Sequence, residues 1–309
     1  MTNGTLSQTP ATCARLRERL LRGTARNGKL RFAGTDGKDV YNITAPFAAN
    51  GRLLLAGRVE ERSVERSSVL FFEENNGVWR RAAGTPVFEG LQDPCVAFIN
   101  GEWVFGGVNF PVMSAGQPGW RMEFFRGKTP DTLRHFLSGP DRMKDIRLAQ
   151  LTDGRVGVFT RPQGTVGGRG KIGFLAADSL ERITAPALVS APLLAPQCVD
   201  DEWVGANEIH PLPGGVLGVL GHIAHFSADG ARHYCAMAFR FDPATRAAEP
   251  LRLIADRGFF PPGPAKRPDL ADVIFSGGLS RDGNGSALLY AGLGDCEAGW
   301  TEIPDPFAA

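Results

Sequence analysis

The chain has 309 residues, with 34 Lys and Arg against 33 Asp and Glu, so its formal net charge is +1 at pH 7. This balance argues against nucleic acid as a partner and against a polybasic arm that binds anionic membranes. Hydrophobic residues make up 43% of the chain and charged residues 22%, which is typical of a globular protein.

Taken in chain order, the sequence predicts one helix followed by many short strands. Residues 11–22 place Leu16, Leu20 and Leu21 on one side of a helix and arginines on the other. The remaining β-rich segments are separated by Gly, Pro, Asn and Asp, the residues that form tight turns. The clearest predicted strands are residues 52–59, 67–72, 102–108, 122–126, 155–160, 171–175, 216–222, 234–241 and 287–292.

The cysteines and the N-terminus indicate a cytoplasmic protein. Five cysteines are present, and none forms a CxxC pair with another, so we expect reduced thiols and no metal site built on cysteine. No apolar stretch approaches the length of a membrane span. The first residues also lack the charged and then apolar pattern of a signal peptide. The sequence is compatible with a homo-oligomer as well as with a monomer.

A repeat organises the β-rich region. Each of five segments opens on a polar residue, passes through a Gly-containing turn and a strand, and closes on a second polar residue. The opening residues follow one another at intervals of roughly 50–65 residues, as expected for repeated units of several short strands. They are Asn42, Asp93, Asp145, Glu208 and Asp272, and the closing residues are Arg58, Asn109, Arg161, His222 and Asp295.

This repeat predicts an all-β fold, a five-bladed β-propeller in a single domain over residues 1–309 with a short N-terminal helix. Residues 1–25 form an N-terminal extension, and the blades start near residues 40, 92, 143, 205 and 270. Residues 29–33 could supply the missing outer strand of the last blade. The inner strands of a propeller line its channel, so the repeated polar residues would converge in one pocket. The alternative is a two-sheet β protein whose segments are similar by accident.

Several motifs resemble those of the mannosyltransferase/phosphorylase family, five-bladed β-propellers related to the β-mannoside phosphorylases of glycoside hydrolase family 130. The resemblance extends from about residue 40 to residue 295. The matching motifs are Gln92-Asp93-Pro94, Met143-Lys144-Asp145, Thr160-Arg161-Pro162, Gly221-His222 and the run from Ala291 to Asp295. One departure concerns the acid motif, which ends in Cys95 where the related phosphorylases usually have Arg, so the acceptor subsite stays unassigned.

Asp93 is the candidate general acid, because cleavage of a glycosidic bond requires a proton on the departing oxygen. An Asp-Pro step is also a common turn cap when it stands alone. Lys144, Arg161 and His222 are the candidate phosphate ligands, since charge-assisted donors hold an oxyanion well and His can adjust its protonation near neutral pH. Taken singly, these three could be a solvated charge, an ion-paired arginine and a core histidine.

One acid beside a cationic cluster favours phosphorolysis over hydrolysis, because an inverting hydrolase needs a second carboxylate as base. Hydrolysis is the alternative, because any of the other carboxylates in the repeat could be that base. We assign binding of sugar hydroxyls to the remaining repeat residues, where ordinary turn chemistry is the alternative. They are Asn42, Arg58, Asp145, Glu208, Asp272 and Asp295.

The sequence and the resemblance together predict a glycoside phosphorylase that needs inorganic phosphate as a co-substrate and no cofactor or metal. The resemblance implies inverting phosphorolysis of β-mannosides, with β-1,2-linked manno-oligosaccharides as substrates and mannose 1-phosphate as product. The rivals are a β-mannoside hydrolase, a sugar-nucleotide-dependent mannosyltransferase and a non-catalytic sugar-binding propeller.

Weaker signals remain outside these assignments. The five tryptophans could stack on sugars, although packing explains most of them. The glycine-rich run 164–170 is predicted to be a hairpin or a lid. Lys266 and Arg267 lie in a proline-rich loop over residues 261–269, where we expect solvent exposure rather than contact with phosphate.

Overall fold

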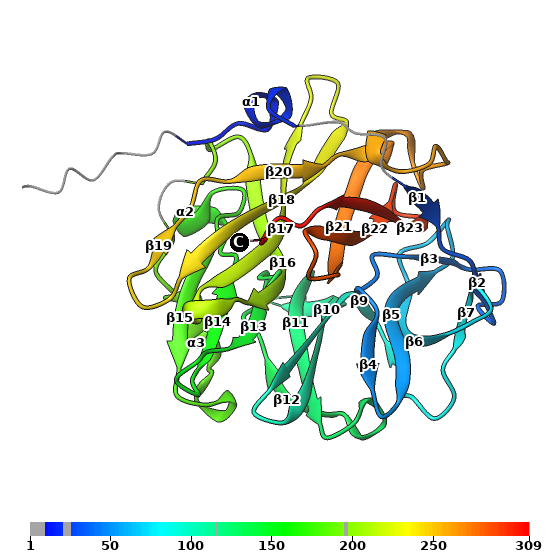
Figure 1. Ribbon diagram of the computed structural model, residues 1–309, viewed down its shortest axis with the longest axis horizontal. Coiled ribbons are helices and arrows are strands. Elements are labelled where there is room, and N and C mark those ends of the chain that lie inside the picture. Colours follow the sequence, from blue (N-terminus) through cyan, green and yellow to red (C-terminus); the bar gives the residue numbers. More distant parts are fainter. Residues whose placement is uncertain (1–9, 21–25, 115, 195–196, 309) are drawn as a thin grey trace, which may run out of the picture.

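The computed structural model describes residues 10–20, 26–114, 116–194 and 197–308. The described chain is mostly β-strand, and the strand groups succeed one another around the molecule in sequence order (Figure 1). The hydrogen-bonded strands form four sheets, and a short parallel contact divides the largest sheet into two groups, so five successive units of mainly antiparallel strands can be distinguished. Among the described residues, no helix is long and apolar enough to cross a membrane.

The first two units are separate sheets formed by strands β2 to β12. The first unit is a seven-stranded sheet made of β2 (Phe32–Ala33), β3 (Asp39–Tyr41), β4 (Phe47–Ala49), β5 (Arg52–Glu60), β6 (Ser67–Asn75), β7 (Val78–Arg81) and β8 (Phe88–Glu89). The second is a four-stranded sheet made of β9 (Leu91–Ile99), β10 (Glu102–Ser114), β11 (Gln117–Gly127) and β12 (Arg134–Ser138).

The other three units complete the circuit. The third unit consists of β13 (Arg147–Gln150), β14 (Val156–Thr160) and β15 (Gly173–Ala177). The fourth consists of β16 (Trp203–Pro211), β17 (Leu217–Phe226), β18 (Arg232–Asp242), β19 (Ala247–Ala248) and β20 (Arg252–Ala255). The fifth consists of β21 (Asp272–Arg281), β22 (Ser286–Leu293), β23 (Glu297–Pro304) and β1 (Asn27–Lys29). A two-residue parallel contact between β18 and β21 joins the fourth and fifth units into one nine-stranded sheet.

Short helices lie in the connections. The α-helices are α1 (Cys13–Glu18), α2 (Gly164–Gly167) and α3 (Ala185–Val189). The single-turn 3-10 helices are Pro130–Thr132, Leu180–Arg182, Pro213–Gly215, Arg257–Phe259 and Pro268–Leu270. The N-terminal helix starts after Thr12, whose hydroxyl accepts a hydrogen bond from the backbone N–H of Arg15 at 3.2 Å and so caps it.

Every strand predicted from the sequence overlaps an observed strand, because the β-rich segments are bounded by strong turn residues. The helix prediction is too long: α1 ends at Glu18, while the prediction extended to residue 22, and residues 21 and 22 lie outside the described chain. The glycine-rich run at 164–170 begins with the one-turn helix α2, where a hairpin or lid was expected.

The first and last units are joined by the segment that follows α1. Strand β1 pairs antiparallel with β23, so that Asn27 faces Thr301 and Lys29 faces Gly299. A few residues later β2 pairs with β7 of the first unit. The prediction of a closing strand at 29–33 therefore has the correct partner, but the pairing residues are 27–29.

The inner strands carry irregularities that turn polar side chains toward the middle. In β9 the register shifts so that Asp93 and Pro94 lie opposite Gly107, and β16 contains a similar bulge at Asn207. Positive φ angles occur at Asn42 (44°), Asp93 (48°), Asp145 (58°) and Asp295 (55°). Asn and Asp tolerate this left-handed conformation better than other side chains, and such residues cluster at functional sites.

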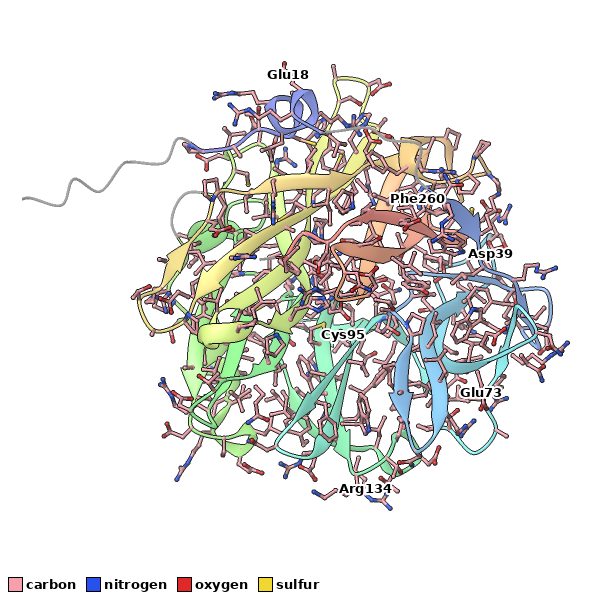
Figure 2. All side chains as sticks on the ribbon, in the orientation of Figure 1. Glu18, Asp39, Glu73, Cys95, Arg134 and Phe260 are labelled. Carbon is pink, nitrogen blue, oxygen red and sulfur yellow. The ribbon has the colours of Figure 1, made fainter. Side chains whose placement is uncertain are left out.

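The hydrophobic core fills the space between neighbouring units. Phe88 of the first unit stacks on Phe105 of the second, with ring centroids 4.6 Å apart. Side chains occupy the gaps between the ribbons throughout, and Cys95 lies near the centre (Figure 2). All five cysteines are buried free thiols. The units therefore pack against one another through apolar side chains, and the polar residues are left for the central cavity.

Candidate active site

A cavity of about 350 Å³ gathers residues from all five units. Eight of the ten predicted site residues line it, namely Asn42, Arg58, Asp93, Lys144, Asp145, Arg161, His222 and Asp295. The other lining residues are Glu65, Gln92, Val108, Phe110, Trp120, Arg232, Tyr234, Lys266, Arg267, Leu270, Val273 and Phe275. The lining thus combines carboxylates, cations and a few aromatic rings, as expected of a binding pocket for a polar small molecule.

The carboxylate of Asp93 is held on one side by two donors. Its Oδ1 accepts a hydrogen bond from Asn42 Nδ2 at 2.7 Å and from Arg58 Nη1 at 3.4 Å. The bulge in β9 and the left-handed backbone at Asp93 aim this side chain into the cavity. Asp93 is nevertheless 7% exposed, so it is a shielded carboxyl group that a ligand in the cavity can reach.

Asp145 lies among cations on another part of the wall. Its Oδ2 is 3.1 Å from Arg161 Nε, and its Oδ1 is 4.0 Å from Arg147 Nη2. Burial alone would raise the pKa of Asp145, but the charges of Arg161, His222, Lys144 and Arg147 outweigh it and lower the pKa to about 2. Asp145 is therefore ionised at neutral pH, and the cations around it outnumber it.

His222 is buried and carries no charge at neutral pH. Its Nδ1 hydrogen-bonds Asn207 Oδ1 at 2.8 Å. Burial, aided by the charges of Arg161, Lys144 and Arg147, lowers the pKa of His222 to about 3 against the opposing effect of Asp145. The expectation that this histidine adjusts its protonation near neutral pH is therefore wrong, and the positive charge of the cluster comes from Lys144 and the two arginines.

Gly205, which sequence reasoning missed, makes this arrangement possible. A Cβ at residue 205 would lie 2.6 Å from His222 Cε1 and 2.8 Å from Asp145 Oδ2. Only a glycine allows both side chains to approach the strand so closely. The rings of Tyr234 and Phe275 pack beside the imidazole at centroid distances of 5.3 and 5.8 Å.

Asp295 occupies the cavity together with Asp93. Burial raises the pKa of Asp295, and the charge of Asp93 adds to the effect, while Arg58, Lys266 and Lys144 oppose it. The charges of Asp93 and Arg58 therefore act on the pKa of Asp295 in opposite directions, and burial makes the largest contribution to its rise.

Glu208 and Asp272 do not line the cavity. Glu208 Oε2 accepts a hydrogen bond from the backbone N–H of Leu279 at 2.7 Å and so links β16 to β21. Asp272 Oδ2 lies 2.7 Å from both Arg17 Nη2 and His233 Nδ1. Its carboxylate attaches the N-terminal helix to the body of the protein, so its observed contacts are structural.

The proline-rich loop behaves differently at its two basic residues. The side chain of Lys266 is only 6% exposed and forms an ion pair with Glu60, so the expectation of solvent exposure is wrong for this residue. Arg267 is 41% exposed and pairs with Asp269 at 3.0 Å and with Glu65 at 3.4 Å. Both residues form part of the cavity wall.

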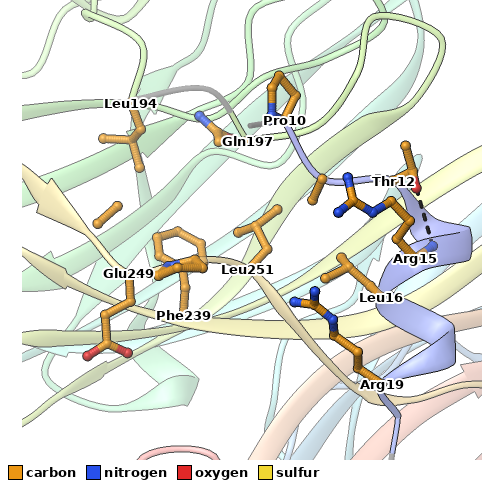
Figure 3. Close-up of a pocket in the computed structure, with 13 residues that line it drawn as sticks. Pro10, Thr12, Arg15, Leu16, Arg19, Leu194, Gln197, Phe239, Glu249 and Leu251 are labelled. Atoms are coloured by element: carbon orange, nitrogen blue, oxygen red, sulfur yellow. Dashed lines mark hydrogen bonds between the residues drawn. The ribbon is translucent and has the colours of Figure 1, made fainter. Parts of the chain in front are cut away.

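A second cavity, of about 230 Å³, lies beneath α1 (Figure 3). Leu16, Phe239 and Leu251 contribute to its apolar lining, and the side chains of Arg15 and Arg19 lie beside it. No predicted site residue lines this cavity. It contains one carboxylate, that of Glu249, and no cluster of convergent charges among its lining residues, so the central cavity is the better candidate for catalysis.

Two solved structures are similar to this chain over nearly its whole length. A mannose phosphorylase from Leishmania mexicana, MPT-4, solved in complex with phosphate ion, is 35% identical and has a TM-score of 0.86, with 95% of this chain and 92% of that chain covered. A GDP-Man-dependent mannosyltransferase from Leishmania mexicana, MPT-1, is 32% identical with a TM-score of 0.86 and 96% of both chains covered.

More distant matches share the fold alone. A β-1,2-mannobiose phosphorylase from Listeria innocua is 12% identical with a TM-score of 0.59, and 92% of each chain is covered. No curated protein sequence matched this chain. The family model described as "Protein of unknown function (DUF1861)" matches residues 18–309. The chain therefore belongs to the DUF1861 family, and it is similar in sequence and fold to a mannose phosphorylase and a mannosyltransferase.

Proposed function

We propose that the protein is an inverting glycoside phosphorylase acting on β-mannosides, and that its five strand units are the blades of a five-bladed β-propeller. The proposal rests above all on the meeting of Asp93 with Lys144 and Arg161 in one cavity. The substrates proposed are β-1,2-linked manno-oligosaccharides, and the products are mannose 1-phosphate and a shortened oligosaccharide. The similarity to mannose-active proteins at 35% and 32% identity supports the choice of sugar.

The proposed reaction is a single displacement. Asp93 gives its proton to the glycosidic oxygen as the bond from that oxygen to the anomeric carbon breaks. A phosphate oxygen attacks the same carbon from the opposite face, so a carbon–oxygen bond to phosphate forms with inversion. In the reverse direction ionised Asp93 takes the proton from the attacking sugar hydroxyl, and inorganic phosphate leaves.

Lys144 and Arg161 are the proposed charged ligands of phosphate, because both line the cavity and belong to its cationic part. Asp145 orients Arg161 through the 3.1 Å contact, and neutral His222 would take part as a hydrogen-bonding group rather than as a cation. Asn42, Arg58 and Asp295 lie on the Asp93 side, where hydroxyl groups of the sugar would be held.

Hydrolysis is the less favoured reaction in this cavity. A hydrolase needs a carboxylate that accepts a proton from water on the face opposite the acid. The low pKa of Asp145, about 2, and its pairing with Arg161 make it a poor proton acceptor. Asp295 shares the electrostatic surroundings of Asp93 itself. The cations of the site favour an anionic nucleophile over water.

Sugar transfer from a nucleotide donor is the second candidate, since a GDP-Man-dependent mannosyltransferase is 32% identical over almost the whole chain. The Arg232 and Arg267 side chains at the cavity would be available for a larger anionic donor, although Arg267 is already paired with carboxylates. Donor identity therefore has to be tested directly.

A screen of β-mannosides with and without inorganic phosphate tests the proposal. We expect mannose 1-phosphate only when phosphate is present, and Asp93→Asn should abolish its release. Asp153→Asn, which removes a carboxylate from an exposed turn, is the matched control and should behave as the wild type. Free mannose would indicate a hydrolase, transfer from GDP-Man alone would indicate a transferase, and binding without turnover would indicate a sugar-binding protein.

A further inference from the structure

Glu60 is the centre of a buried charge network beside the cavity. Its side chain is 0% exposed. One carboxylate oxygen, Oε2, accepts hydrogen bonds from Arg58 Nε at 3.2 Å and from Arg58 Nη2 at 2.7 Å. The other, Oε1, accepts from the hydroxyl of Tyr41 at 2.7 Å and is in contact with Nζ of Lys266. The carboxylate of Glu60 thus contacts two cationic side chains and one phenol group in a buried position.

Lys266 connects this network to a distant part of the chain. Its Nζ also donates to the carbonyl oxygen of Val64 at 3.1 Å. Its backbone N–H donates to the carbonyl oxygen of Gly294 at 2.7 Å, directly before Asp295. The ion pair between Glu60 and Lys266 therefore fixes the loop over residues 261–269 against the first unit, and the backbone hydrogen bond fixes it against the turn that carries Asp295.

Arg58 lies between Glu60 and Asp93. Its Nε and Nη2 groups are directed to Glu60, while Nη1 is 3.4 Å from Asp93 Oδ1. Arg58 therefore donates two hydrogen bonds to Glu60 and one, longer hydrogen bond to Asp93. A guanidinium that is partly neutralised by one carboxylate stabilises the ionised form of a second carboxylate less than a free guanidinium does.

We propose that Glu60 is a positioning residue for the reaction at Asp93: it holds Arg58 and offsets part of its charge, so that Arg58 favours the ionised form of Asp93 less than a free guanidinium would. This inference rests on the proposed role of Asp93 as general acid. Without Glu60, Arg58 would present its full charge to Asp93 and would favour the carboxylate. With Glu60 but without Lys266, the surroundings of Asp93 would become more negative.

Other charged groups face the same space and stay constant in the comparison. Besides Lys266, the charged or titratable side chains that line the cavity with Asp93 are Arg58, Glu65, Lys144, Asp145, Arg161, His222, Arg232, Tyr234, Arg267 and Asp295. The test therefore changes one network charge at a time and leaves these residues in place. The sign of the shift, rather than its size alone, then identifies the cause.

The basic limb of the pH profile of kcat/KM for phosphorolysis reports loss of the proton from the acid in the free enzyme. Glu60→Gln removes a negative charge and should move this limb to lower pH by roughly one unit. Lys266→Met removes a positive charge and should move it to higher pH. Tyr41→Phe keeps every charge and should leave the limb in place, as should Glu73→Gln, the control on an exposed ion pair of the same sheet.

A direct titration makes the inference testable without turnover. The carboxyl carbon of Asp93, identified in 13C NMR spectra by its loss in Asp93→Asn, should titrate at lower pH in Glu60→Gln and at higher pH in Lys266→Met. Shifts of the same sign in both variants, or no shift in either, would refute the role of Glu60. The expected shifts in a protein without phosphorylase activity would support the network and refute the proposed function instead. Circular dichroism identifies a variant that fails to fold, and the other variant then decides.

Discussion

Replacing Gly205 with alanine tests whether the close approach of Asp145 and His222 is essential. The new Cβ would lie 2.6 Å from His222 Cε1 and 2.8 Å from Asp145 Oδ2. Carbon atoms that do not share a bond pack at about 3.5–4.0 Å, so the imidazole has to move by about 1 Å. Its ring is confined by Tyr234 and Phe275, and the movement should therefore break the hydrogen bond to Asn207.

Overpacking of this kind costs about 1–3 kcal/mol of the free energy of unfolding, and a displacement of about 1 Å at a catalytic site can cost about 100-fold in rate. We expect Gly205→Ala to lower kcat/KM for phosphorolysis by about that factor while the protein stays folded, as measured by initial rates and thermal unfolding. Gly119→Ala is the control, since its added Cβ would meet nothing closer than 3.6 Å. Wild-type kcat/KM in Gly205→Ala would refute the assignment of this contact to the active site.

Three further predictions concern charge and pH. The pKa of Asp145 is lowered from 3.8 to about 2, so its ionised carboxylate should contribute about 2 kcal/mol to the free energy of unfolding above pH 4. This contribution should be lost as the pH falls toward 2, and the free energy of unfolding of Asp145→Asn, measured in urea, should lack this pH dependence. The pKa of His222 is lowered from 6.5 to about 3, so stability should be complete above pH 6.5 and should fall below it by up to about 1.4 kcal/mol per pH unit, a slope that His222→Gln should reduce. Asp272→Asn should leave kcat/KM unchanged and should speed hydrogen exchange in α1, because the contacts with Arg17 and His233 are weakened and neither residue lines the cavity; a large loss of activity would place Asp272 in the site after all.

The sequence predicted residues of the cavity lining correctly where the repeat places them at or near the ends of strands. Asn42, Asp93 and Asp145 follow one another at nearly constant intervals, each beside an apolar segment, and all three line the cavity. The positions of the strands were predicted correctly because turn residues bound them on both sides. The family resemblance could be stated because these motifs lie in the same order as in the family.

The remaining site residues depend on strand register, which the sequence does not display. In β16 the bulge falls on Asn207, one residue before Glu208, so Asn207 contacts His222 while the repeat residue Glu208 does not line the cavity. In β21 the corresponding bulge falls on Gly277, where a Cβ would lie 1.5 Å from the carbonyl oxygen of Ile43, and not on Asp272. The burial of Lys266 was equally hidden, since its partner lies 206 residues away.

The pairing of β1 with β23 has a consequence for how the protein is made. Of the described strands, β1 is synthesised first and its partner β23, over Glu297–Pro304, is synthesised last. The cavity wall includes Asn42 from the first strand unit and Asp295 from the last. A nascent polypeptide can thus complete most of its sheets while this pocket is still open on one side, and translation must pass β23 before β1 can pair with it.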